Sequence, residues 1–137
     1  PRSVFERIHF HEELTSYGHE DTLYGKDLQA KGIAMRYIDN PVFHDIFDSS
    51  ETFLEKTETG LLNACRYPNL MKGHVRILDI QQRCKRAGLQ PLIRFLFAIF
   101  EKPLRRNLLG KRPKLRAFDL YKLGYICRLD HRMKQAR

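Results

Sequence analysis

Two adjacent carboxylates, Glu20 and Asp21, are the residues of this chain whose types and spacing are best suited to chemistry. They follow an aromatic residue, a glycine and a histidine, in the order Tyr17, Gly18, His19. A carboxylate within hydrogen-bond reach of a hydroxyl can act as a general base when that hydroxyl attacks a sugar's anomeric carbon. Acidic residues in the first turn of a helix can also serve only the helix dipole, by about 0.3 to 1 kcal/mol. The pair therefore indicates either a catalytic base with a polar neighbour or an ordinary helix start.

Histidines supply the other groups that could take part in such chemistry. Sugar transfer must also stabilise a leaving nucleotide diphosphate, which a divalent cation held by carboxylates and sometimes an imidazole can do. His44 follows Pro41 closely and could be such a ligand, or could pack locally. His19 could contact a substrate or be an exposed loop residue. We interpret His9 and His11 as structural, because they flank Phe10 on alternating sides.

The order of these residues resembles a known family. An aromatic-Gly-x-Glu-Asp motif stands at residues 17–21, and a predicted helix then ends at Gly32. A predicted strand leads through Pro41 to His44, and the segment 8–14 is similar to the one that precedes the motif in the family. Residues 2–44 thus resemble the second half of the catalytic domain of family 2 glycosyltransferases, inverting enzymes with a GT-A fold.

The resemblance implies a role for each motif residue. It implies that Asp21 is the catalytic base and that Glu20 holds acceptor hydroxyls or orients the loop. His44 would be a metal ligand. Tyr17, Gly18 and His19 would border the substrate, with Tyr17 either stacking on a sugar ring or packing beneath the turn.

The resemblance also implies partners, and a part of the enzyme that this chain does not contain. The expected substrates are a nucleotide-sugar donor and a glycan or lipid-linked acceptor, as in polysaccharide or lipopolysaccharide synthesis. The expected cofactor is Mn²⁺ or Mg²⁺, held mostly by the family's donor-binding half with its Asp-x-Asp motif. No two aspartates of this chain lie two residues apart. We therefore expect a C-terminal portion of a larger enzyme, inactive without that half.

Charge divides the chain into two parts. Residues 1–60 carry six Lys or Arg and twelve Asp or Glu, a net charge of −6, whereas residues 61–137 carry nineteen and four, a net charge of +15. Basic amphipathic helices can lie on anionic lipid, which fits the cytoplasmic side of a plasma membrane. The same charges could be the solvated face of a helical core, a nucleic-acid-binding module or a protein-binding or self-associating surface. The acidic first part and the lack of a recognition motif disfavour nucleic acid.

Hydrophobic periodicity predicts an α+β chain that is predominantly helical. Residues 1–47 would belong to the catalytic domain and residues 48–137 to a basic helical extension. We predict a strand over residues 33–39 and helices over 19–31, 75–87, 91–109 and 115–132, the third interrupted near Pro103. A capping box at residues 48–51 should start another helix, with one apolar face made by Phe53, Thr57, Leu61 and Cys65.

The composition agrees with a small folded domain. Apolar residues make up 42% of 137 residues, enough for a modest core. The three cysteines, Cys65, Cys84 and Cys127, are widely separated and form no Cys-x-x-Cys pair. We interpret them as reduced, structural thiols of a cytoplasmic protein.

Overall fold

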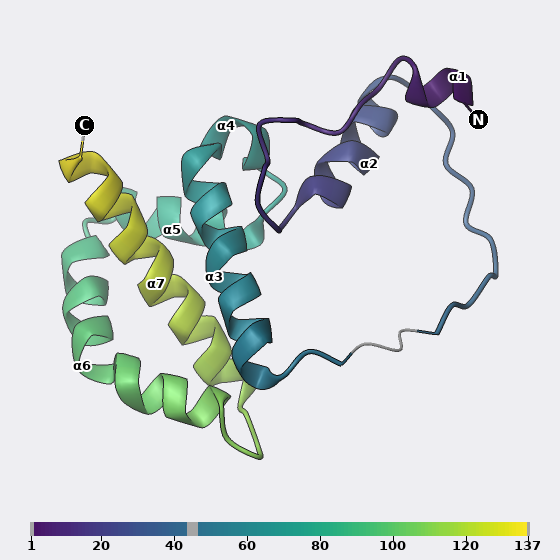
Figure 1. Cartoon of the computed structure of the whole chain (residues 1–137). Helices are drawn as coiled ribbons and strands as arrows, with labels where there is room; N and C mark the ends of the chain where they lie inside the picture. Colours follow the sequence, from purple (N-terminus) through teal and green to yellow (C-terminus); the bar gives the residue numbers. More distant parts are fainter. Residues whose placement is uncertain (1, 44–46, 137) are drawn as a thin grey trace.

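The computed structural model describes residues 2–43 and 47–136, and the regular elements of this part of the chain are all α-helices (Figure 1). Helices account for 66% of the structure. In chain order they are α1 (Arg2–Phe5), α2 (Glu20–Ala30), α3 (Ser50–Arg66), α4 (Pro68–Met71), α5 (Arg76–Arg86), α6 (Gln90–Leu108) and α7 (Leu115–Gln135). The predicted α+β class, and with it a portion of a GT-A α/β domain, is therefore wrong.

The predicted strand over residues 33–39 is absent from the described structure. This segment crosses open space as irregular backbone, with Met35, Tyr37 and Ile38 exposed to solvent. A strand needs a neighbour to pair its N–H and C=O groups. No described segment lies alongside as a pairing partner, and the backbone hydrogen bond from Asn40 N to Ile38 O, at 3.0 Å, is local. Alternating side chains reveal which residues would share a face, but they do not supply the neighbouring strand.

The predicted helix boundaries are largely confirmed, because local capping sets them. Gly32 ends α2 with φ = +67°, and the amide of Ile33 donates to the carbonyl of Leu28 at 3.0 Å. This is the Schellman arrangement, in which a left-handed residue lets the chain satisfy the last carbonyls. At the start of α3, the Ser49 hydroxyl accepts a hydrogen bond from the amide of Thr52 at 3.1 Å.

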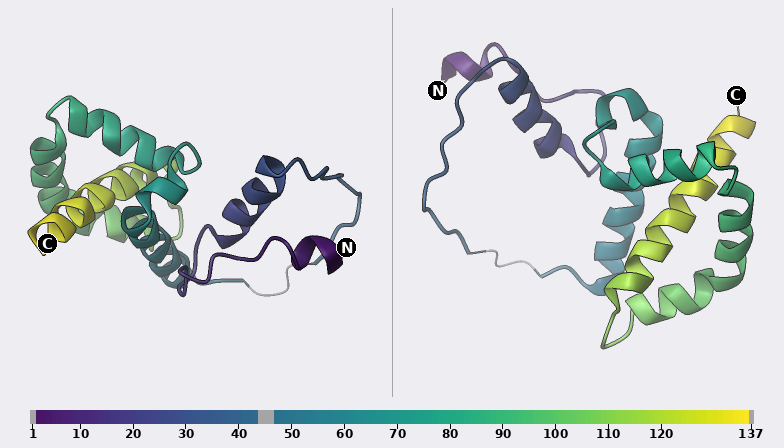
Figure 2. Two further views of the ribbon diagram at one scale, coloured as in Figure 1. Left: turned by 90° about the horizontal axis from the view of Figure 1, so that it is seen from above. Right: turned by 180° about the vertical axis from the view of Figure 1, so that it is seen from behind.

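Helix α7 lies at the centre of the helical bundle and packs against α3, α5 and α6 (Figures 1 and 2). One core cluster joins five helices and the turn between α4 and α5. Its buried members are Leu23, Leu61, Ala64, Met71, Val75, Leu78 and Ile126. A second cluster consists of Leu54, Phe97, Leu108 and Tyr121. Because Leu23 of α2 belongs to the first cluster, the motif-bearing segment shares a core with the basic helices.

The apolar face predicted for α3 is only partly correct. Leu61 is buried, but Phe53 is half exposed and Thr57 is only partly covered. Leu54 and Ala64 lie inside in their place. The predicted residues recur every four positions, whereas a helix turns every 3.6 residues, so such a row winds away from the core.

Polar contacts fix the long helices α3, α6 and α7 to one another. The Tyr121 hydroxyl donates to Glu58 Oε1 at 2.6 Å, and Arg105 donates to the same oxygen at 3.1 Å. Burial first, and the Glu58 carboxylate second, raise the pKa of Tyr121. Pro103 does not end α6 but lies within it, and Figure 1 shows the helix bending in this region, because proline removes one backbone hydrogen bond.

Within the part of the chain that is described, no helix has the length and apolar character needed to cross a membrane.

We predict that Gly124→Ala destabilises the bundle. A Cβ at this position of α7 would lie 2.2 Å from the ring of Phe97 and 2.7 Å from its Cβ. Overpacking of this kind costs about 1 to 3 kcal/mol and should outweigh the roughly 1 kcal/mol that alanine gains in a helix. Urea unfolding measures the difference. Gly25→Ala is the matched control, since nothing lies within 4 Å of its Cβ, and it should be neutral or stabilising. Equal effects of the two substitutions would contradict the Phe97 contact.

Candidate functional site

A cleft of about 700 Å³ contains the predicted motif residues. It lies between the turn at residues 17–21, the middle of α3, the start of α5 and one residue of α7. Its lining comprises Tyr17, Gly18, His19, Glu20, Asp21, Asp48, Phe53, Lys56, Thr57, Gly60, Leu61, His74, Val75, Arg76, Ile77 and Lys122. The structure thus brings together five of the six predicted site residues. The sixth, His44, lies outside the described residues.

One buried side chain of α3 holds the segment that leads into the motif. The Asn63 amide donates to the carbonyl of Ser16 at 2.9 Å and to that of Tyr17 at 3.3 Å. Its carbonyl oxygen accepts from the Ser16 hydroxyl at 2.9 Å. Farther along, the Tyr67 hydroxyl donates to the carbonyl of Glu13 at 2.8 Å. The segment that leads into the motif is therefore attached to α3 and to the residue after it, mainly by hydrogen bonds from the Asn63 and Tyr67 side chains to its backbone carbonyls.

A contact between two glycines brings the motif against α3. A Cβ on Gly18, whose φ is +122°, would lie only 2.8 Å from Gly60 Cα. The next residue, His19, has φ = +74°, and it is the non-glycine residue with positive φ in the described chain. Such a conformation costs about 1 to 3 kcal/mol in a non-glycine residue and tends to occur at functional sites. The turn is thus a strained segment that its surroundings hold in place.

The two carboxylates of the motif have different environments. Glu20 Oε2 accepts a hydrogen bond from the amide of Gly18 at 2.8 Å, so this side chain closes the turn on itself. Asp21 is exposed, and its Oδ1 accepts from the amide of Thr22 at 2.7 Å. Its Oδ2 has no hydrogen-bond partner among the described residues. Asp21 therefore offers a carboxylate oxygen to a ligand, while Glu20 serves the shape of the loop.

His19 lies at the base of the turn, close to α3. A Cβ at Gly60 would lie 3.7 Å from its Nε2, which places the ring over the helix backbone. Burial lowers the pKa of His19, and the negative charges of Asp21 and Glu20 oppose that effect only in part. The ring is accordingly neutral at pH 7 and can both donate and accept one hydrogen bond.

Cationic side chains come to the cleft from three different helices. Lys56 of α3 pairs with Asp48 at 2.7 Å and lies 5.2 Å from the centre of the Tyr17 ring. Lys122 of α7 pairs with Asp119 at 2.9 Å. Arg76 is exposed at the start of α5 and forms no ion pair with a described residue. An anionic group in the cleft would thus lie near positive charge as well as near Asp21.

Sequence reasoning did not identify the residues that α3, α5 and α7 contribute. Arg76 and Lys122 resemble the many other basic residues of the second part of the chain. The one local signal is Gly60, since a glycine in the interior of a helix weakens it by about 1 kcal/mol. A Cβ at Gly60 would meet only ordinary contacts, the nearest 3.7 Å away at His19, so the close approach requires a glycine at position 18 rather than at position 60.

The described residues do not form a metal centre. No group of three or more His, Cys, Asp or Glu side chains lies within range of a common ion in residues 2–43 and 47–136. His11 forms a hydrogen bond with Asp27 at 2.9 Å, and His9 lies edge-on to the ring of Phe5. Neither His9 nor His11 lines the cleft, and their structural role stays a prediction.

The cysteines also fit the structural role predicted from the sequence. All three are free thiols. Burial raises the pKa of Cys65 to about 12 and that of Cys127 to about 11. Neither is a thiolate at neutral pH, so neither is activated as a nucleophile.

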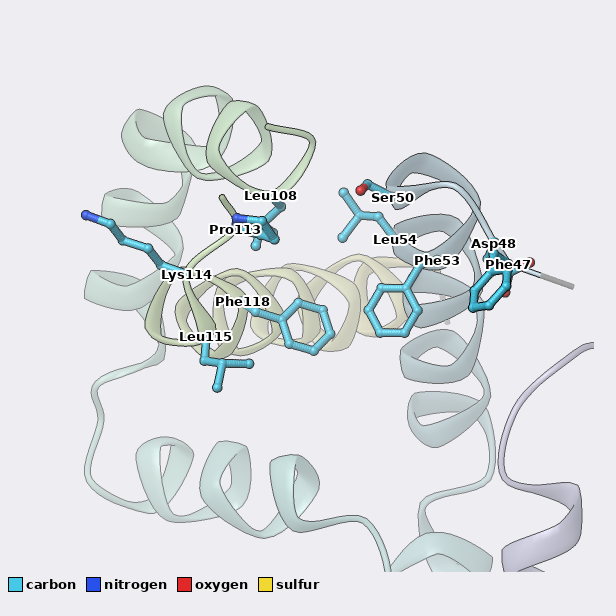
Figure 3. A pocket seen from close by; sticks show the side chains of 10 residues that line it. All are labelled: Phe47, Asp48, Ser50, Phe53, Leu54, Leu108, Pro113, Lys114, Leu115 and Phe118. Carbon is cyan, nitrogen blue, oxygen red and sulfur yellow. The ribbon is translucent and has the colours of Figure 1, made fainter. Parts of the chain in front are cut away.

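A second cavity, of about 460 Å³, lies where the start of α3 faces the start of α7 (Figure 3). Phe53 and Phe118 meet there with ring centres 5.6 Å apart. Figure 3 shows Lys114 directed away from this aromatic pair. Asp48 lines both cavities but is engaged by Lys56. This cavity offers apolar surface rather than a free charged group, so the cleft at the motif is the better candidate site.

Comparison with protein-family models, with curated proteins and with solved structures finds no match to this chain. The chemistry of the cleft is therefore deduced from its own residues. These combine a backbone-anchored turn, one exposed carboxylate and nearby cations within a single concave surface. Such a combination is typical of a site that binds a polar ligand.

We predict opposite effects for alanine at the two glycines that meet below the motif. Gly18→Ala adds a Cβ to a positive-φ residue and directs it at Gly60 Cα, so it should cost about 1 to 3 kcal/mol. Gly60→Ala meets only ordinary contacts, the nearest 3.7 Å away at His19, and should gain up to about 1 kcal/mol from helix propensity. Thermal unfolding of both variants checks this. Destabilisation by both would contradict the described geometry.

His19 should make stability depend on pH in the mildly acidic range. Its pKa in the folded protein lies below the ordinary histidine value of 6.5, so near and below pH 6.5 the unfolded chain binds more protons than the folded one. The buried neutral ring of His19 makes its full contribution to the free energy of unfolding above pH 6.5, and this contribution is lost as the pH falls through the pKa of the folded protein. His19→Asn removes the titration and tolerates positive φ.

The measurement is the free energy of unfolding of each protein between about pH 7.5 and about pH 5.5. As the pH falls, the free energy of unfolding of the wild type should decrease more than that of His19→Asn, so the variant becomes relatively more stable. His74→Asn, at an exposed histidine of the same cleft, is the control. A pH-independent difference for His19→Asn would show that burial of this ring does not disfavour its charged form.

Proposed function

We propose that the cleft is the acceptor side of a sugar-transfer site, in which Asp21 is the general base. The reaction would transfer a sugar, with inversion, from a nucleotide-sugar donor to a hydroxyl of a glycan or lipid-linked acceptor. The observation that carries the proposal is the exposed Asp21 carboxylate at the edge of a 700 Å³ cleft, on a turn that Asn63 and Gly60 hold against α3. Of the resemblance to family 2 glycosyltransferases, the GT-A fold and the strand over residues 33–39 are absent from the described residues, and the motif at residues 17–21 is what favours the same reaction class.

The proposed chemistry assigns a distinct task to each group. An acceptor hydroxyl donates a hydrogen bond to Asp21 Oδ2. As its oxygen attacks the anomeric carbon, the bond from that carbon to the nucleotide diphosphate breaks on the opposite face, and Asp21 takes the proton. Glu20 keeps the turn closed through its bond to Gly18. The half-exposed Tyr17 ring offers a stacking surface for a sugar.

The cations of the cleft support binding of a diphosphate. Arg76 and Lys122 reach the same concave surface as Asp21 from α5 and α7. A positive charge there would favour the charge that develops on the leaving group. The expected Mn²⁺ or Mg²⁺ enters no step of this proposal, because the described residues do not fit a metal centre. A lipid-linked acceptor would place the reaction at the cytoplasmic face of the plasma membrane.

We predict that Asp21→Asn abolishes transfer while leaving the fold intact. Loss of a general base costs about 10² to 10⁴ in rate. Asp21 is exposed in the first turn of α2, so removing its charge should cost no more than about 1 kcal/mol of stability. The assay is transfer from UDP- and GDP-sugars to glycan and lipid-linked acceptors, with Mg²⁺ or Mn²⁺ present, by the polypeptide that carries this chain. The loss should appear in kcat, with a small change in KM. Asp39→Asn, at an exposed aspartate outside the cleft, should behave like wild type.

Full turnover by Asp21→Asn would remove Asp21 from the reaction. A folded wild-type protein that turns over no donor in the presence of acceptors would instead favour the alternative, a basic helical binding module for nucleic acid or for a protein partner.

A further inference from the structure

One face of α6 is apolar and open to solvent. Its members recur with the i, i+3, i+4, i+7, i+8 spacing that places side chains on one side of a helix, and they are between 42% and 64% exposed. They are Leu92, Phe95, Leu96, Ile99 and Phe100, and we call them the α6 stripe. The opposite side of the helix already supplies Phe97 and Leu108 to the core. The stripe is therefore additional to the face that the bundle buries.

The α6 stripe continues into a groove of about 550 Å³ between α6 and α7. Leu96 and Phe100 line it from α6, and Leu120 and Leu123 line it from α7. Among the lining residues only Asn107 has a polar side chain. Leu120 is 60% exposed, so the apolar surface extends from one helix to the next. A contiguous surface of this kind marks contact with a partner or a membrane.

Positive charge follows this apolar surface along the chain, from the second half of α6 to the first turn of α7. Residues 90–118 contain eight Lys or Arg and a single acidic residue, Glu101. Glu101 forms an ion pair with Arg128 of α7 at 2.5 Å, so its charge is neutralised inside the bundle. Six of the cations are exposed, namely Lys102, Arg106, Lys111, Arg112, Lys114 and Arg116.

The combination of apolar and basic surface selects among the candidate occupants. A second copy of the chain would bring the same positive rim against itself, which like-charge repulsion opposes. A nucleic acid would neutralise the cations through its phosphates but would leave the stripe in water. An anionic lipid leaflet satisfies both features, because acyl chains receive the apolar side chains while headgroups meet the lysines and arginines.

We propose that the α6 stripe and its basic rim form a peripheral binding surface for anionic membranes. The part of α6 that carries the stripe lies in the plane of the leaflet, with Phe95 and Ile99 inserted at the level of the acyl chains. The rim residues Lys102 and Arg106 follow the stripe on the same helix and are exposed. Helix α6 lies across the molecule from α2 (Figures 1 and 2). This surface is therefore separate from the cleft, and its test needs no enzymatic activity.

Binding of the chain to vesicles tests the proposal. The two vesicle types are phosphatidylcholine alone and phosphatidylcholine mixed with an equal amount of phosphatidylglycerol, and bound protein is measured by flotation. We expect at least about tenfold tighter binding to the anionic vesicles. The double variant Phe95→Gln/Ile99→Gln should weaken that binding at least about tenfold. Its matched control, Met35→Gln/Ile38→Gln, changes two exposed apolar residues elsewhere and should leave it unchanged.

A second pair of variants tests whether vesicle binding depends on the cations beside the stripe or only on the net positive charge of the chain. Lys102→Gln/Arg106→Gln and Arg66→Gln/Lys72→Gln each remove two positive charges from exposed positions. Only the first pair belongs to the rim, and it should weaken vesicle binding about tenfold or more, whereas the second pair should have a much smaller effect. Equal weakening by both would overturn a localised basic rim.

The chain contains no tryptophan, so an introduced one reports insertion directly. Phe95→Trp should show a blue-shifted emission on anionic vesicles and quenching by lipids brominated along their acyl chains. Tyr37→Trp, at a position that is 92% exposed, should show neither effect. An unshifted tryptophan at position 95 overturns the proposal. The proposal is also overturned if the wild type is a dimer that Phe95→Gln/Ile99→Gln converts to a monomer, or if the chain binds duplex DNA and not vesicles.

Discussion

The packing of α3 against α7 is the constraint on which both the core and the cleft depend. On one side, α3 places Leu61 and Ala64 in the cluster that contains Ile126 of α7. On another side, the same helix presents Gly60 and Asn63 to the motif. Burial of each leucine contributes about 1.5 to 3 kcal/mol, so the core fixes where α3 lies. The position of Asp21 follows from it, because the turn is attached to this helix.

In the turn at residues 17–21, the free-energy cost of a strained backbone is offset by contacts with α3. The left-handed conformation of His19 costs about 1 to 3 kcal/mol. The hydrogen bonds that Asn63 makes to Ser16 and Tyr17 are worth about 0.5 to 1.5 kcal/mol each, which is comparable. Close packing of Gly18 on Gly60 must therefore contribute to holding the segment. A backbone that its surroundings fix in a costly conformation also fixes the position of the Asp21 backbone, and the proposed general-base chemistry would need pre-organisation of this kind.

Local signals in the sequence predicted those parts of the structure that local interactions determine. The end of α2 at Gly32 and the start of α3 near Ser49 are caps, which depend on a few neighbouring residues. The strand over residues 33–39 failed because a strand depends on a partner that alternation does not encode. The predicted motif is contiguous, so the sequence alone could single it out, and residues 17–21 line the cleft. Arg76 and Lys122 lie beside the motif because α5 and α7 pack there. Their spacing in the sequence gives no sign of this packing.

The most direct test of the central claim, that a sugar acceptor binds beside Asp21, is chemical-shift mapping of the backbone amides while glycans and soluble analogues of lipid-linked acceptors are added. The account predicts shifts that cluster at Gly18, His19 and Asp21 and extend across the cleft to Gly60 and Arg76. Shifts confined to α6 and α7, or none at the motif with any acceptor that the full polypeptide uses, would contradict it.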